Sequence, residues 1–196
     1  MSNDICFKEA LARCRTLFDQ AEKLPRKDPL AMSLATVDAA GQPSVRMVLL
    51  RGFDERGFVF YTNSESRKGQ QLASNPQAGI CFYWEELREQ LRVEGVVEKV
   101  GDIESDAYWE TRSRLSQLAA KASKQSAVLS DRQLFEDEVQ QLGREFPGAV
   151  PRPDLWYGFR VVPDRIEFWA GREGRMHERT LYERGVDHWT QTVLYP

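Results

Sequence analysis

The apolar positions at the start of the chain recur at helical spacing. Between residues 5 and 24 an apolar side chain returns every three or four positions, as on one face of an amphipathic helix. The positions concerned are Phe7, Leu11, Cys14, Phe18 and Ala21. Pro25 and Pro29 then end the pattern, because proline interrupts helical hydrogen bonding. We therefore expect an N-terminal helix and connection over residues 1–27, ahead of a main domain over 28–196.

After this helix the pattern changes to short apolar runs separated by turn residues. Such runs predict strands over 31–37, 44–52, 58–62, 78–84 and 90–100, with turns at 38–41 and 54–57. The run 58–62 is almost entirely apolar or aromatic, which is typical of a strand covered on both faces. Ser64 is a suitable N-cap for a short helix that ends near Asn75.

Helical spacing returns over 103–122 and 131–146, separated by a Lys- and Ser-rich stretch. A linker over 147–153 follows, and strand-like patterning returns over 157–194 with turns at 163–164 and 185–187. Short strands and hairpin turns around a helical insert of about 103–146 predict one domain that is mainly β. We expect an antiparallel barrel with peripheral helices.

Composition narrows the function classes. A 41% apolar and 29% charged chain of 196 residues suits a soluble globular protein, and a net charge of −3 argues against a nucleic-acid-binding surface. Three scattered cysteines without a metal-ligand spacing suit a reducing cytoplasm and no metal site. The first residues have no secretory leader pattern, and no apolar run is long enough to span a membrane. Dinucleotide, nucleoside-triphosphatase and hydrolase motifs are absent from the sequence.

Two arginines lie near the ends of the apolar run 44–52. Alternation along a single strand would put Arg46 and Arg51 on opposite faces of the sheet. An arginine flanked by buried strand residues needs a partner, because an unpaired buried charge is costly. That partner is either a structural Asp or Glu, or an anionic ligand.

Ser66, Arg67 and Lys68 fall in the first turn of the predicted short helix. Cations there oppose the helix macrodipole, which favours negative charge at that end. A bound phosphate, held by backbone N–H groups and both side chains, explains two adjacent cations at such a place. The alternative is that both side chains extend into solvent.

Tyr108, Arg112 and Ser116 are spaced four residues apart, which is one stripe of the predicted helix 103–122. Two hydroxyls and a guanidinium on one face can bind a phosphate. A solvated helix face is the alternative. The polar loop 123–126 indicates little by itself.

Near the C-terminus Arg175, His177 and Arg179 occupy every second position among strand-forming residues. In a strand all three would share one face and would need an anion or water, as on a solvated edge strand. Together with aromatic residues expected at the surface (Tyr61, Trp84 and Trp169), the phosphate-binding patterns suit an aromatic phosphate cofactor beside an aromatic phosphate substrate.

These segments together resemble the pyridoxine/pyridoxamine 5′-phosphate oxidase family of FMN enzymes with a split-barrel fold. The resemblance covers residues 28–196. It depends on several short motifs occurring in order: Arg46-Met47-Val48-Leu49-Leu50, Phe60-Tyr61-Thr62-Asn63, Ser66-Arg67-Lys68, Ser123-Lys124-Gln125-Ser126, Ile166-Glu167-Phe168-Trp169 and Arg175-Met176-His177-Glu178-Arg179.

The resemblance implies a role for each matching residue. FMN would be held, with Arg67 and Lys68 on its phosphate, by Arg46, Met47, Val48, Leu49, Leu50, Arg51, Tyr61, Thr62, Arg67, Lys68, Gln90, Gln125, Ser126, Trp169 and Arg179. The substrate would contact Arg51, Tyr108, Arg112, Ser116, Arg175 and His177. Of these, Arg175 and His177 would be catalytic, near the carbon that loses hydride.

The resemblance also implies oxidation of pyridoxine or pyridoxamine 5′-phosphate by dioxygen to pyridoxal 5′-phosphate, in vitamin B6 metabolism. Hydrogen peroxide, and ammonia from the amine, would be the other products. A homodimer with FMN at the interface is expected, with no nucleic-acid or membrane partner. The chain departs from the family where Arg51 replaces the usual Lys and where Val193 replaces an Arg, and the arm that precedes the first helix in longer members is expected to be essentially missing.

Two other functions remain open from the sequence. One is a sibling flavin oxidase acting on another aromatic substrate, such as a phenazine precursor, which would have no use for the stripe formed by Tyr108, Arg112 and Ser116. The other is a non-catalytic flavin-binding protein, which would keep Arg67 and Lys68 without needing Arg175 and His177.

Overall fold

The computed structural model describes residues 4–196. The expectation of no secretory leader concerns the first residues of the chain, most of which lie outside the described residues. Helix α1 (Ile5–Ala21) begins where the Asp4 carboxylate accepts hydrogen bonds from the backbone N–H groups of Cys6 and Phe7, at 2.9 and 3.2 Å. The helix ends three residues before the predicted limit, in a short turn that precedes Pro25.

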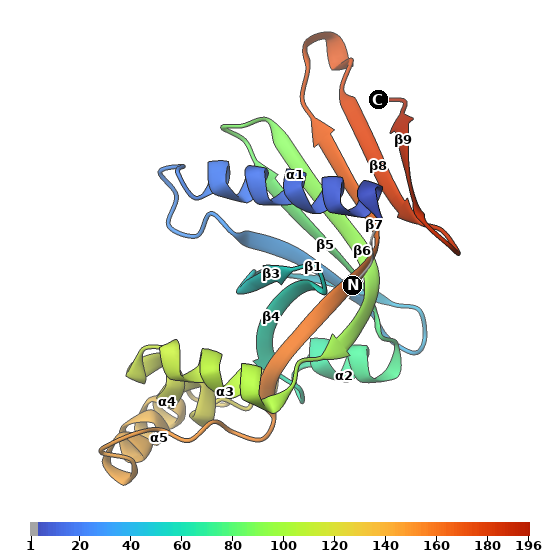
Figure 1. The fold of residues 1–196 in the computed structure, drawn as a ribbon. Helices are drawn as coiled ribbons and strands as arrows, with labels where there is room; N and C mark the ends of the chain where they lie inside the picture. The colour runs from blue at the N-terminus through green and yellow to red at the C-terminus, as the bar shows by residue number, and fades with distance from the viewer. Residues whose placement is uncertain (1–3) are drawn as a thin grey trace.

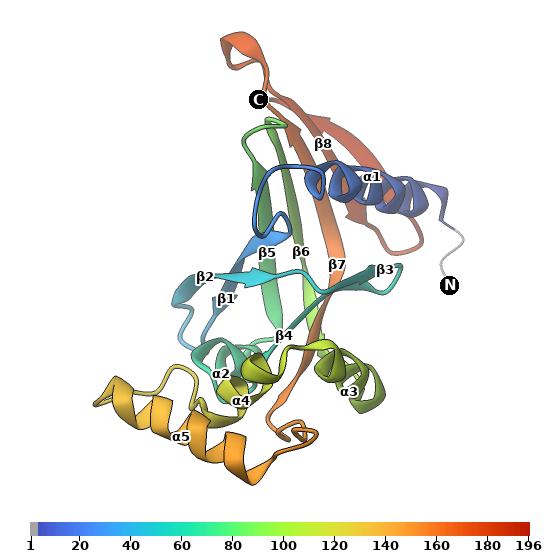
Figure 2. The same cartoon turned by 90° about the vertical axis from the view of Figure 1, so that its left-hand side faces the viewer.

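One antiparallel sheet organises the rest of the described chain (Figures 1 and 2). Its strands are β1 (Ala31–Val37), β2 (Pro43–Leu49), β3 (Gly52–Asp54), β4 (Gly57–Asn63), β5 (Gln77–Trp84), β6 (Glu89–Lys99), β7 (Trp156–Ala170), β8 (Glu178–Arg184) and β9 (Trp189–Leu194). The order along the sheet is β2-β1-β5-β6-β7-β4-β3, with β8 paired to β7 and β9 to β8. The prediction of a mainly antiparallel β split barrel with peripheral helices is confirmed.

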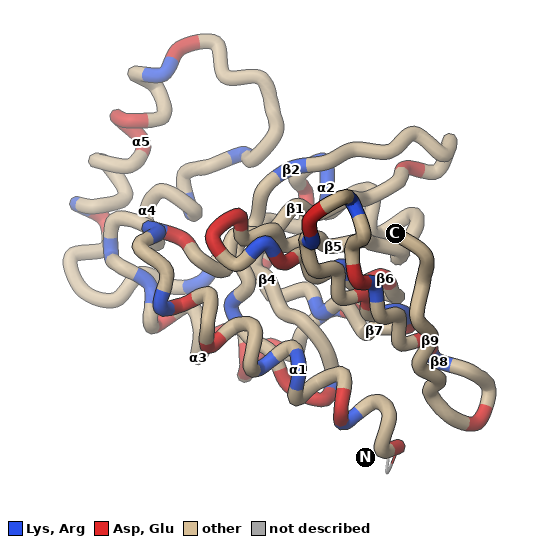
Figure 3. The backbone as a smooth tube through the Cα atoms, turned by 90° about the horizontal axis from the view of Figure 1, so that it is seen from above, with Lys and Arg blue, Asp and Glu red and all other residues tan. Residues whose placement is uncertain are grey.

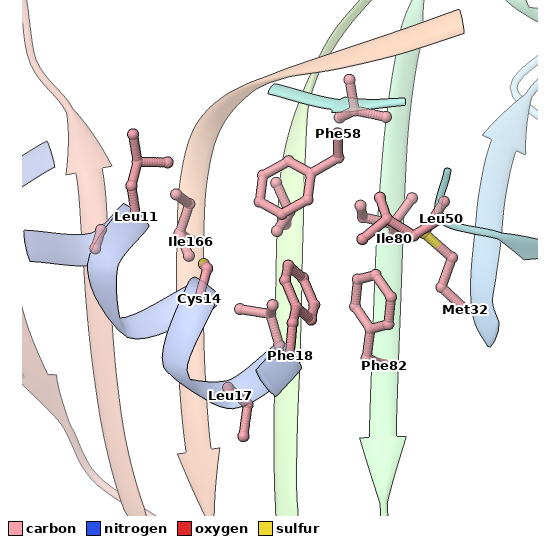
Figure 4. Packing of buried hydrophobic residues seen from close by; sticks show 14 of the residues in the cluster. Leu11, Cys14, Leu17, Phe18, Met32, Leu50, Phe58, Ile80, Phe82 and Ile166 are labelled. Carbon is pink, nitrogen blue, oxygen red and sulfur yellow. The ribbon is translucent and has the colours of Figure 1, made fainter. Parts of the chain in front are cut away.

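The main core lies between α1 and the face of the sheet that it covers. Leu11, Cys14 and Phe18 of α1 pack against sheet residues that include Phe58 and Phe82 (Figure 4). The Phe18 ring lies 5.3 Å from the Phe82 ring and 6.4 Å from the Phe58 ring, measured between centroids. The apolar stripe read from the sequence is therefore the face that α1 buries.

Trp84 is one aromatic residue whose surface position was predicted wrongly. It is 1% exposed, its ring stacks on Phe82 at 5.4 Å, and its indole N–H donates to the carbonyl of Pro29 at 2.7 Å. Alternation along β5 puts Ile80, Phe82 and Trp84 on the same buried face.

Two strand boundaries also differ from the prediction. The run 44–52 is not a single strand, because β2 ends at Leu49 and β3 begins at Gly52. Arg51 lies in this break, so alternation along one strand does not relate it to Arg46.

The turn predicted at 163–164 is wrong, because both residues lie inside the long strand β7. The pairing of β7 with β6 shifts register between Glu94 and Gly95, and Pro163 lies opposite Gly95. A Cβ at Gly95 would meet the Val162 carbonyl oxygen at 1.9 Å. The irregularity in the ladder thus accommodates a proline within a paired strand.

The remaining helices gather at the end of the sheet opposite the β7–β8 connection (Figures 1 and 2). They are α2 (Arg67–Ser74), α3 (Asp102–Thr111), α4 (Arg114–Ala122) and α5 (Arg132–Glu145). A second core cluster, which includes Trp109, Leu118, Leu142 and Trp156, joins α3–α5 to the start of β7. Among the described residues, no helix is long and apolar enough to cross a membrane.

Candidate active site

A cavity of about 830 Å³ lies where β2 and β4 meet α2, α3 and α4. Eleven of the residues selected from the sequence line it: Met47, Val48, Leu49, Arg51, Tyr61, Thr62, Lys68, Tyr108, Arg112, Ser116 and Gln125. Arg46, Arg67 and Ser126 belong to the same segments but are not part of the lining. The Leu50 side chain is 4% exposed and packs in the main core instead (Figure 4).

Lys68 is a buried residue of this lining, in the first turn of α2. Its ammonium group donates to Thr62 Oγ1 and Gln125 Oε1, both at 2.8 Å, and to Ser66 Oγ at 3.1 Å. Burial, with a smaller effect from the positive charge of Arg46, lowers the pKa of Lys68 to about 8. All three acceptors are neutral, so this buried cation lacks a compensating negative charge.

The N-cap of α2 is Ser66 and not Ser64. The Ser66 hydroxyl accepts from the backbone N–H of Gly69, and no acidic residue lies in the first turn. Arg67 and Lys68 are thus the first two residues of the helix, as the prediction of cations in its opening turn required. A helix start that carries cations and no carboxylate favours an anion at that place.

Arg46 reaches from β2 toward α2 and also finds neutral acceptors. Its guanidinium donates to Thr36 Oγ1 at 2.6 Å, to Gln71 Oε1 at 3.1 Å, and to two backbone carbonyls. Burial first, and then repulsion from Arg67, lower its pKa. An Asp or Glu was one of the two partners expected for Arg46, but in the described part of the chain Arg46 contacts Thr36 and Gln71 instead.

The predicted helix 103–122 is broken at Arg112 and Ser113. Arg112 is the C-cap of α3 with an extended backbone, and the Ser113 hydroxyl caps α4 by accepting from the Ser116 N–H. Tyr108, Arg112 and Ser116 therefore do not form a stripe of one helix, and that prediction is wrong. The kink between the two helices nevertheless brings all three to the same cavity wall.

Arg112 is packed between aromatic rings. Its guanidinium carbon lies 4.7 Å from the centre of the Trp156 ring and 5.2 Å from that of Trp109. Its Nη1 atom is buried and has no hydrogen-bond partner. Burial first, with repulsion from Arg51 as a smaller effect, lowers its pKa. A buried donor without a partner is uncommon, and because Arg112 lines the cavity a bound ligand can satisfy it.

The charges around the cavity match bound phosphate. Among residues 4–196, Arg46, Arg51, Arg67, Lys68 and Arg112 form no ion pair with a carboxylate within 4.0 Å, whereas most other arginines do. Two sub-clusters result, Arg46-Arg67-Lys68 at α2 and Arg51-Arg112 at α3. The donor set therefore fits two separate anionic groups, such as the phosphate of a flavin nucleotide and that of a substrate.

The other predicted residues lie around the β7–β8 connection. Arg175 belongs to a short 3₁₀ turn (η1, Glu173–Arg175), and β8 begins only at Glu178. The segment 175–179 is therefore not a continuous strand, and alternation does not align its three basic side chains. Arg175 is exposed with a positive φ of 60°, which is uncommon for a residue other than glycine.

Within this region His177 and Trp169 are in contact. Their ring centres are 4.6 Å apart, and the backbone N–H of Arg172 donates to His177 Nδ1 at 3.2 Å. Gln90 on β6 lies opposite Trp169 in the sheet register, and Arg179 on β8 lies opposite it on the other side. Gln90, Trp169 and Arg179 thus form one row across three strands.

Arg179 is held by a buried carboxylate. Its Nε donates to Glu167 Oε1 at 2.8 Å, and Glu167 also accepts from Arg92 on β6. Glu167 is 3% exposed; burial raises its pKa, but the hydrogen bond from Arg179 and the charge of Arg92 outweigh burial and lower the pKa overall. Glu167 thus compensates part of the charge of Arg92 and Arg179 within the sheet.

The two groups of predicted residues lie at opposite ends of the sheet. The helices that line the cavity are at one end, and the β7–β8 connection is at the other, in both views (Figures 1 and 2). None of Gln90, Trp169, Arg175, His177 and Arg179 lines the cavity. One chain alone does not bring all of the predicted site residues together.

Residues that sequence reasoning missed also line the cavity, among them Ser113, Phe135 and Trp156. Ser113 carried a signal, because a serine before an apolar run is a common N-cap. No local pattern relates Trp156 to Arg112, since 44 positions separate them along the chain and only the tertiary fold joins them.

Comparisons with known proteins agree with this geometry. A family model described as pyridoxamine 5′-phosphate oxidase matches residues 18–144, and one described as the pyridoxine 5′-phosphate oxidase C-terminal dimerisation region matches residues 156–196. The chain is 50% identical over 189 residues to a pyridoxine/pyridoxamine 5′-phosphate oxidase of Myxococcus xanthus (strain DK1622), covering 96% of this chain and 92% of that protein. It is 51% identical over 177 residues to a protein of the same name from Gluconobacter oxydans (strain 621H), covering 90% and 88% of the two chains.

Two solved structures are also similar. PhzG from Burkholderia lata 383, crystallised with tetrahydrophenazine-1-carboxylic acid, superposes with a TM-score of 0.90 at 32% identity over 95% of this chain and 92% of that one. A pyridoxamine 5′-phosphate oxidase-related, FMN-binding protein from Nostoc punctiforme PCC 73102 has a TM-score of 0.70 at 24% identity, over 96% and 94%. The second likeness supports the fold alone.

Proposed function

The chain belongs to the pyridoxamine 5′-phosphate oxidase family, and on this premise we propose that it is an FMN-dependent oxidase of pyridoxine and pyridoxamine 5′-phosphate. Its product is pyridoxal 5′-phosphate, with dioxygen as the electron acceptor and hydrogen peroxide as the by-product; the amine substrate also releases ammonia. The reaction belongs to vitamin B6 metabolism. We assign it to the cytoplasm, which suits three unpaired cysteine thiols.

The observation that carries the proposal is the arrangement of cations around one cavity. Lys68 and Arg112 lie on the wall of the same cavity, and neither has a carboxylate partner in the described residues. Two phosphate groups held side by side would compensate most of the charge of both clusters. A phosphorylated flavin next to a phosphorylated pyridine ring provides that charge and fills the space between with aromatic rings.

The α2 cluster is assigned to the flavin phosphate. Arg46, Arg67 and Lys68 would supply charge, and Thr62, Gln125 and Ser126 would supply neutral polar contacts. Thr62 and Gln125 already contact Lys68 through their side-chain oxygens. The chemistry that FMN supplies when bound is acceptance of a hydride and transfer of electrons to dioxygen.

The α3–α4 cluster is assigned to the substrate phosphate. The Tyr108 and Ser116 hydroxyls and the Arg112 guanidinium would hold it, and Arg51 would add a second charge. Because the phosphate is remote from the reacting carbon, these contacts fix the position of the pyridine ring. Their main effect should be on the binding of phosphorylated substrates.

His177 and Arg175 would lie at the reacting carbon. Because Arg172 donates an N–H to Nδ1 of His177, a neutral His177 carries its proton on Nε2. That N–H can donate to the 4′-oxygen or 4′-nitrogen of the substrate. Arg175 would orient the ring through its guanidinium, in a loop whose backbone already holds an uncommon conformation.

A homodimer would unite the two ends of the sheet. Each cavity would then receive Gln90, Trp169, Arg175, His177 and Arg179 from the second subunit. This proposal is supported by the position of those residues away from the cavity and by the match to the dimerisation region. A solution mass of twice 22.6 kDa is expected.

An absorption spectrum tests the proposal. The purified protein should show the two visible bands of an oxidised flavin, and anaerobic addition of pyridoxine 5′-phosphate should bleach them. A colourless protein that fails to take up FMN would contradict the cofactor assignment. A yellow protein that is not bleached would contradict the substrate assignment.

The sibling activity on a phenazine precursor is favoured by one observation, the TM-score of 0.90 with PhzG. The Arg51-Arg112 cluster at α3 favours the vitamin B6 substrate, because a phosphate dianion can compensate both arginines, whereas the single carboxylate of a tricyclic acid compensates one. Inorganic phosphate should therefore compete with the substrate of this chain. A substrate oxidised equally fast at all phosphate concentrations would favour the sibling activity.

A further inference from the structure

Trp156 is the centre of an aromatic cluster on the cavity wall. It is the first residue of β7, is 6% exposed, and lines the cavity. The rings of Tyr61 and Tyr108 lie nearly parallel to it with centroids at 5.3 and 6.2 Å, and the Trp109 ring lies edge-on at 4.8 Å. The indole is therefore fixed on several sides by other rings.

The Arg112 guanidinium rests on this cluster without using its hydrogen-bond donors. Its carbon lies 4.7 Å from the Trp156 ring centre, and no side-chain hydrogen bond or ion pair from Arg112 is present among residues 4–196. Arg46, on the neighbouring strand segment but outside the lining, is the contrast, because its guanidinium donates to four protein acceptors. Arg112 is positioned by ring faces and Arg46 by hydrogen bonds.

This difference has a chemical consequence. An arginine held by protein acceptors has fewer N–H groups left for a ligand, whereas one held by a ring face keeps its planar fork free. Attraction between a guanidinium and an indole face is strong when both are withdrawn from water. A ring face can therefore preorganise the arginine and leave its donors for a phosphate.

We propose that Trp156 is a positioning residue that holds Arg112 ready for the substrate phosphate, and so determines preference for phosphorylated over unphosphorylated substrates. The inference depends on the proposed function, because it takes the Arg112 cluster as the substrate-phosphate site. The competing explanation is that Trp156 only fills the second core cluster with Trp109, Leu118 and Leu142. The two explanations differ in what a ring-preserving substitution does.

The chain offers a matched control in Trp189. It is also 6% exposed, its ring stacks on Phe7 at 4.7 Å, and the Arg184 guanidinium lies 5.4 Å from its centre. Arg184, unlike Arg112, donates to a backbone carbonyl and pairs with Asp164. Trp189→Leu therefore removes a buried indole with an arginine on its face, away from the cavity.

The experiment compares wild type, Trp156→Leu, Trp156→Phe and Trp189→Leu. For each, KM and kcat are measured with pyridoxine 5′-phosphate and with pyridoxine, together with flavin content. Trp156→Leu should raise KM for the phosphorylated substrate about 10-fold and change kcat less than about 3-fold. Trp156→Phe keeps a ring face and should recover most of the loss, while Trp189→Leu should leave the ratio between the two substrates unchanged.

The outcomes separate the two explanations. A KM that rises equally for both substrates in Trp156→Leu, or that is not recovered by Trp156→Phe, would reduce Trp156 to a packing role and overturn the inference. If Trp156→Leu does not fold, Trp156→Phe decides alone. It should raise KM about 2- to 3-fold for the phosphorylated substrate only, because phenylalanine has the weaker ring face.

A second measurement is independent of turnover. Calorimetric titration with inorganic phosphate, at saturating FMN so that the α2 cluster is occupied, should show about 10-fold weaker binding by Trp156→Leu than by wild type or Trp189→Leu. If the wild type binds phosphate in this way but oxidises neither substrate, the proposed function fails and the positioning role stands. Equal phosphate affinity in all variants would refute the positioning role whatever the activity.

Discussion

Arginines around the cavity have no carboxylate partner in the described chain, whereas Arg92, Arg172 and Arg179 toward the β7–β8 end of the sheet each contact one. At the β7–β8 end, Arg92 and Arg179 share the buried Glu167, and Arg172 pairs with Glu178. Around the cavity, Arg46 and Lys68 contact only neutral oxygens, and Arg112 contacts only rings. Both signs of charge are spread along the chain (Figure 3), so the contrast is local and does not come from a shortage of carboxylates.

The difference separates cations that have a carboxylate partner within the chain from cavity cations whose charge a bound anion would compensate. An arginine that contacts a carboxylate has its charge compensated, wholly or in part, without any ligand, so removal of that contact should lower stability. A cation with neutral partners keeps a cost that a bound anion can offset, so its removal should mainly lower affinity. Substitutions at the two ends can therefore break this comparison or sharpen it.

The largest effect is expected at the start of α2. Arg67→Ala with Lys68→Ala removes both cations from the first turn, and the protein should lose its flavin completely during purification. The measurement is the ratio of visible to ultraviolet absorbance. Arg132→Ala is the control, because Arg132 is likewise the first residue of a helix, α5, but pairs with Glu136. A double variant that purifies fully yellow would contradict the assignment of this end.

Arg112→Ala should have the next largest effect. Loss of a charged hydrogen bond to the substrate phosphate is expected to raise KM by roughly 1.5–3 kcal/mol in free-energy terms, with a smaller change in kcat. Thermal stability should fall little, because the guanidinium has no carboxylate partner in the described residues. Steady-state kinetics with pyridoxine 5′-phosphate provide the measurement, and an unchanged KM would remove Arg112 from the site.

Lys68 should make flavin uptake depend on pH. Its pKa is about 8 in the ligand-free protein, below the ordinary value of 10.5, and a bound phosphate dianion should raise it again. Flavin binding therefore takes up a proton above pH 8, and affinity should fall by up to about 10-fold for each pH unit between the two pKa values. Fluorescence titration of the flavin-free protein at pH 7 and pH 9 measures this, and Lys68→Met should abolish the difference.

The same depressed pKa affects stability with the opposite sign. Between pH 8 and 10.5 the unfolded chain holds the Lys68 proton and the ligand-free native state does not, so stability from this group rises with pH there. Bound flavin should remove that gain. For flavin uptake, a pH dependence that persisted in Lys68→Met would show that the proton taken up on binding belongs to a group other than Lys68.

The smallest effect is expected at the ion pairs that Glu167 forms with Arg92 and Arg179. Glu167→Gln should lower the free energy of unfolding by about 1 kcal/mol at pH 7, a modest value because Arg92 and Arg179 are partly exposed to solvent. The folded-state pKa of Glu167 lies below 4.5, so its stabilisation is present above that pH and disappears as the pH falls through the folded-state pKa. Urea unfolding at pH 7 and near pH 3 should show the difference shrinking.

Glu183→Gln is the matched control for this last substitution. Glu183 pairs with Arg165 on the same strands but is 42% exposed, so its loss should change stability by less. If Glu167→Gln and Glu183→Gln lowered the free energy of unfolding equally, the ion pairs of the buried Glu167 would not stabilise the β7–β8 end more than an exposed pair does.

Much of the fold follows from local patterns in the sequence. The stripe that includes Leu11, Cys14 and Phe18 predicts α1 and its buried face, because helical spacing relates only residues that are close together in the sequence. The failures occur where a distant segment decides. Pro163 resembles a turn residue, but its conformation is set by the irregular pairing with Gly95 on β6.

The candidate site divides in the same way. An anion site at the start of α2 could be predicted from the sequence, because a helix N-terminus is a local feature that favours negative charge. The kink at Arg112 was missed because apolar spacing continues through it, although Ser113 is a recognisable cap. The sequence could not predict that Lys68 and Trp169 lie at opposite ends of the sheet, since their separation depends on the order of the strands between them.

The separation of the two ends has a genetic consequence. If each catalytic centre draws its halves from different subunits, a chain defective at Arg112 and a chain defective at His177 damage non-equivalent parts of it. Mixed assemblies of the two would contain one centre that carries both lesions and one that carries neither. Two impaired alleles expressed together would then give more activity than either gives alone.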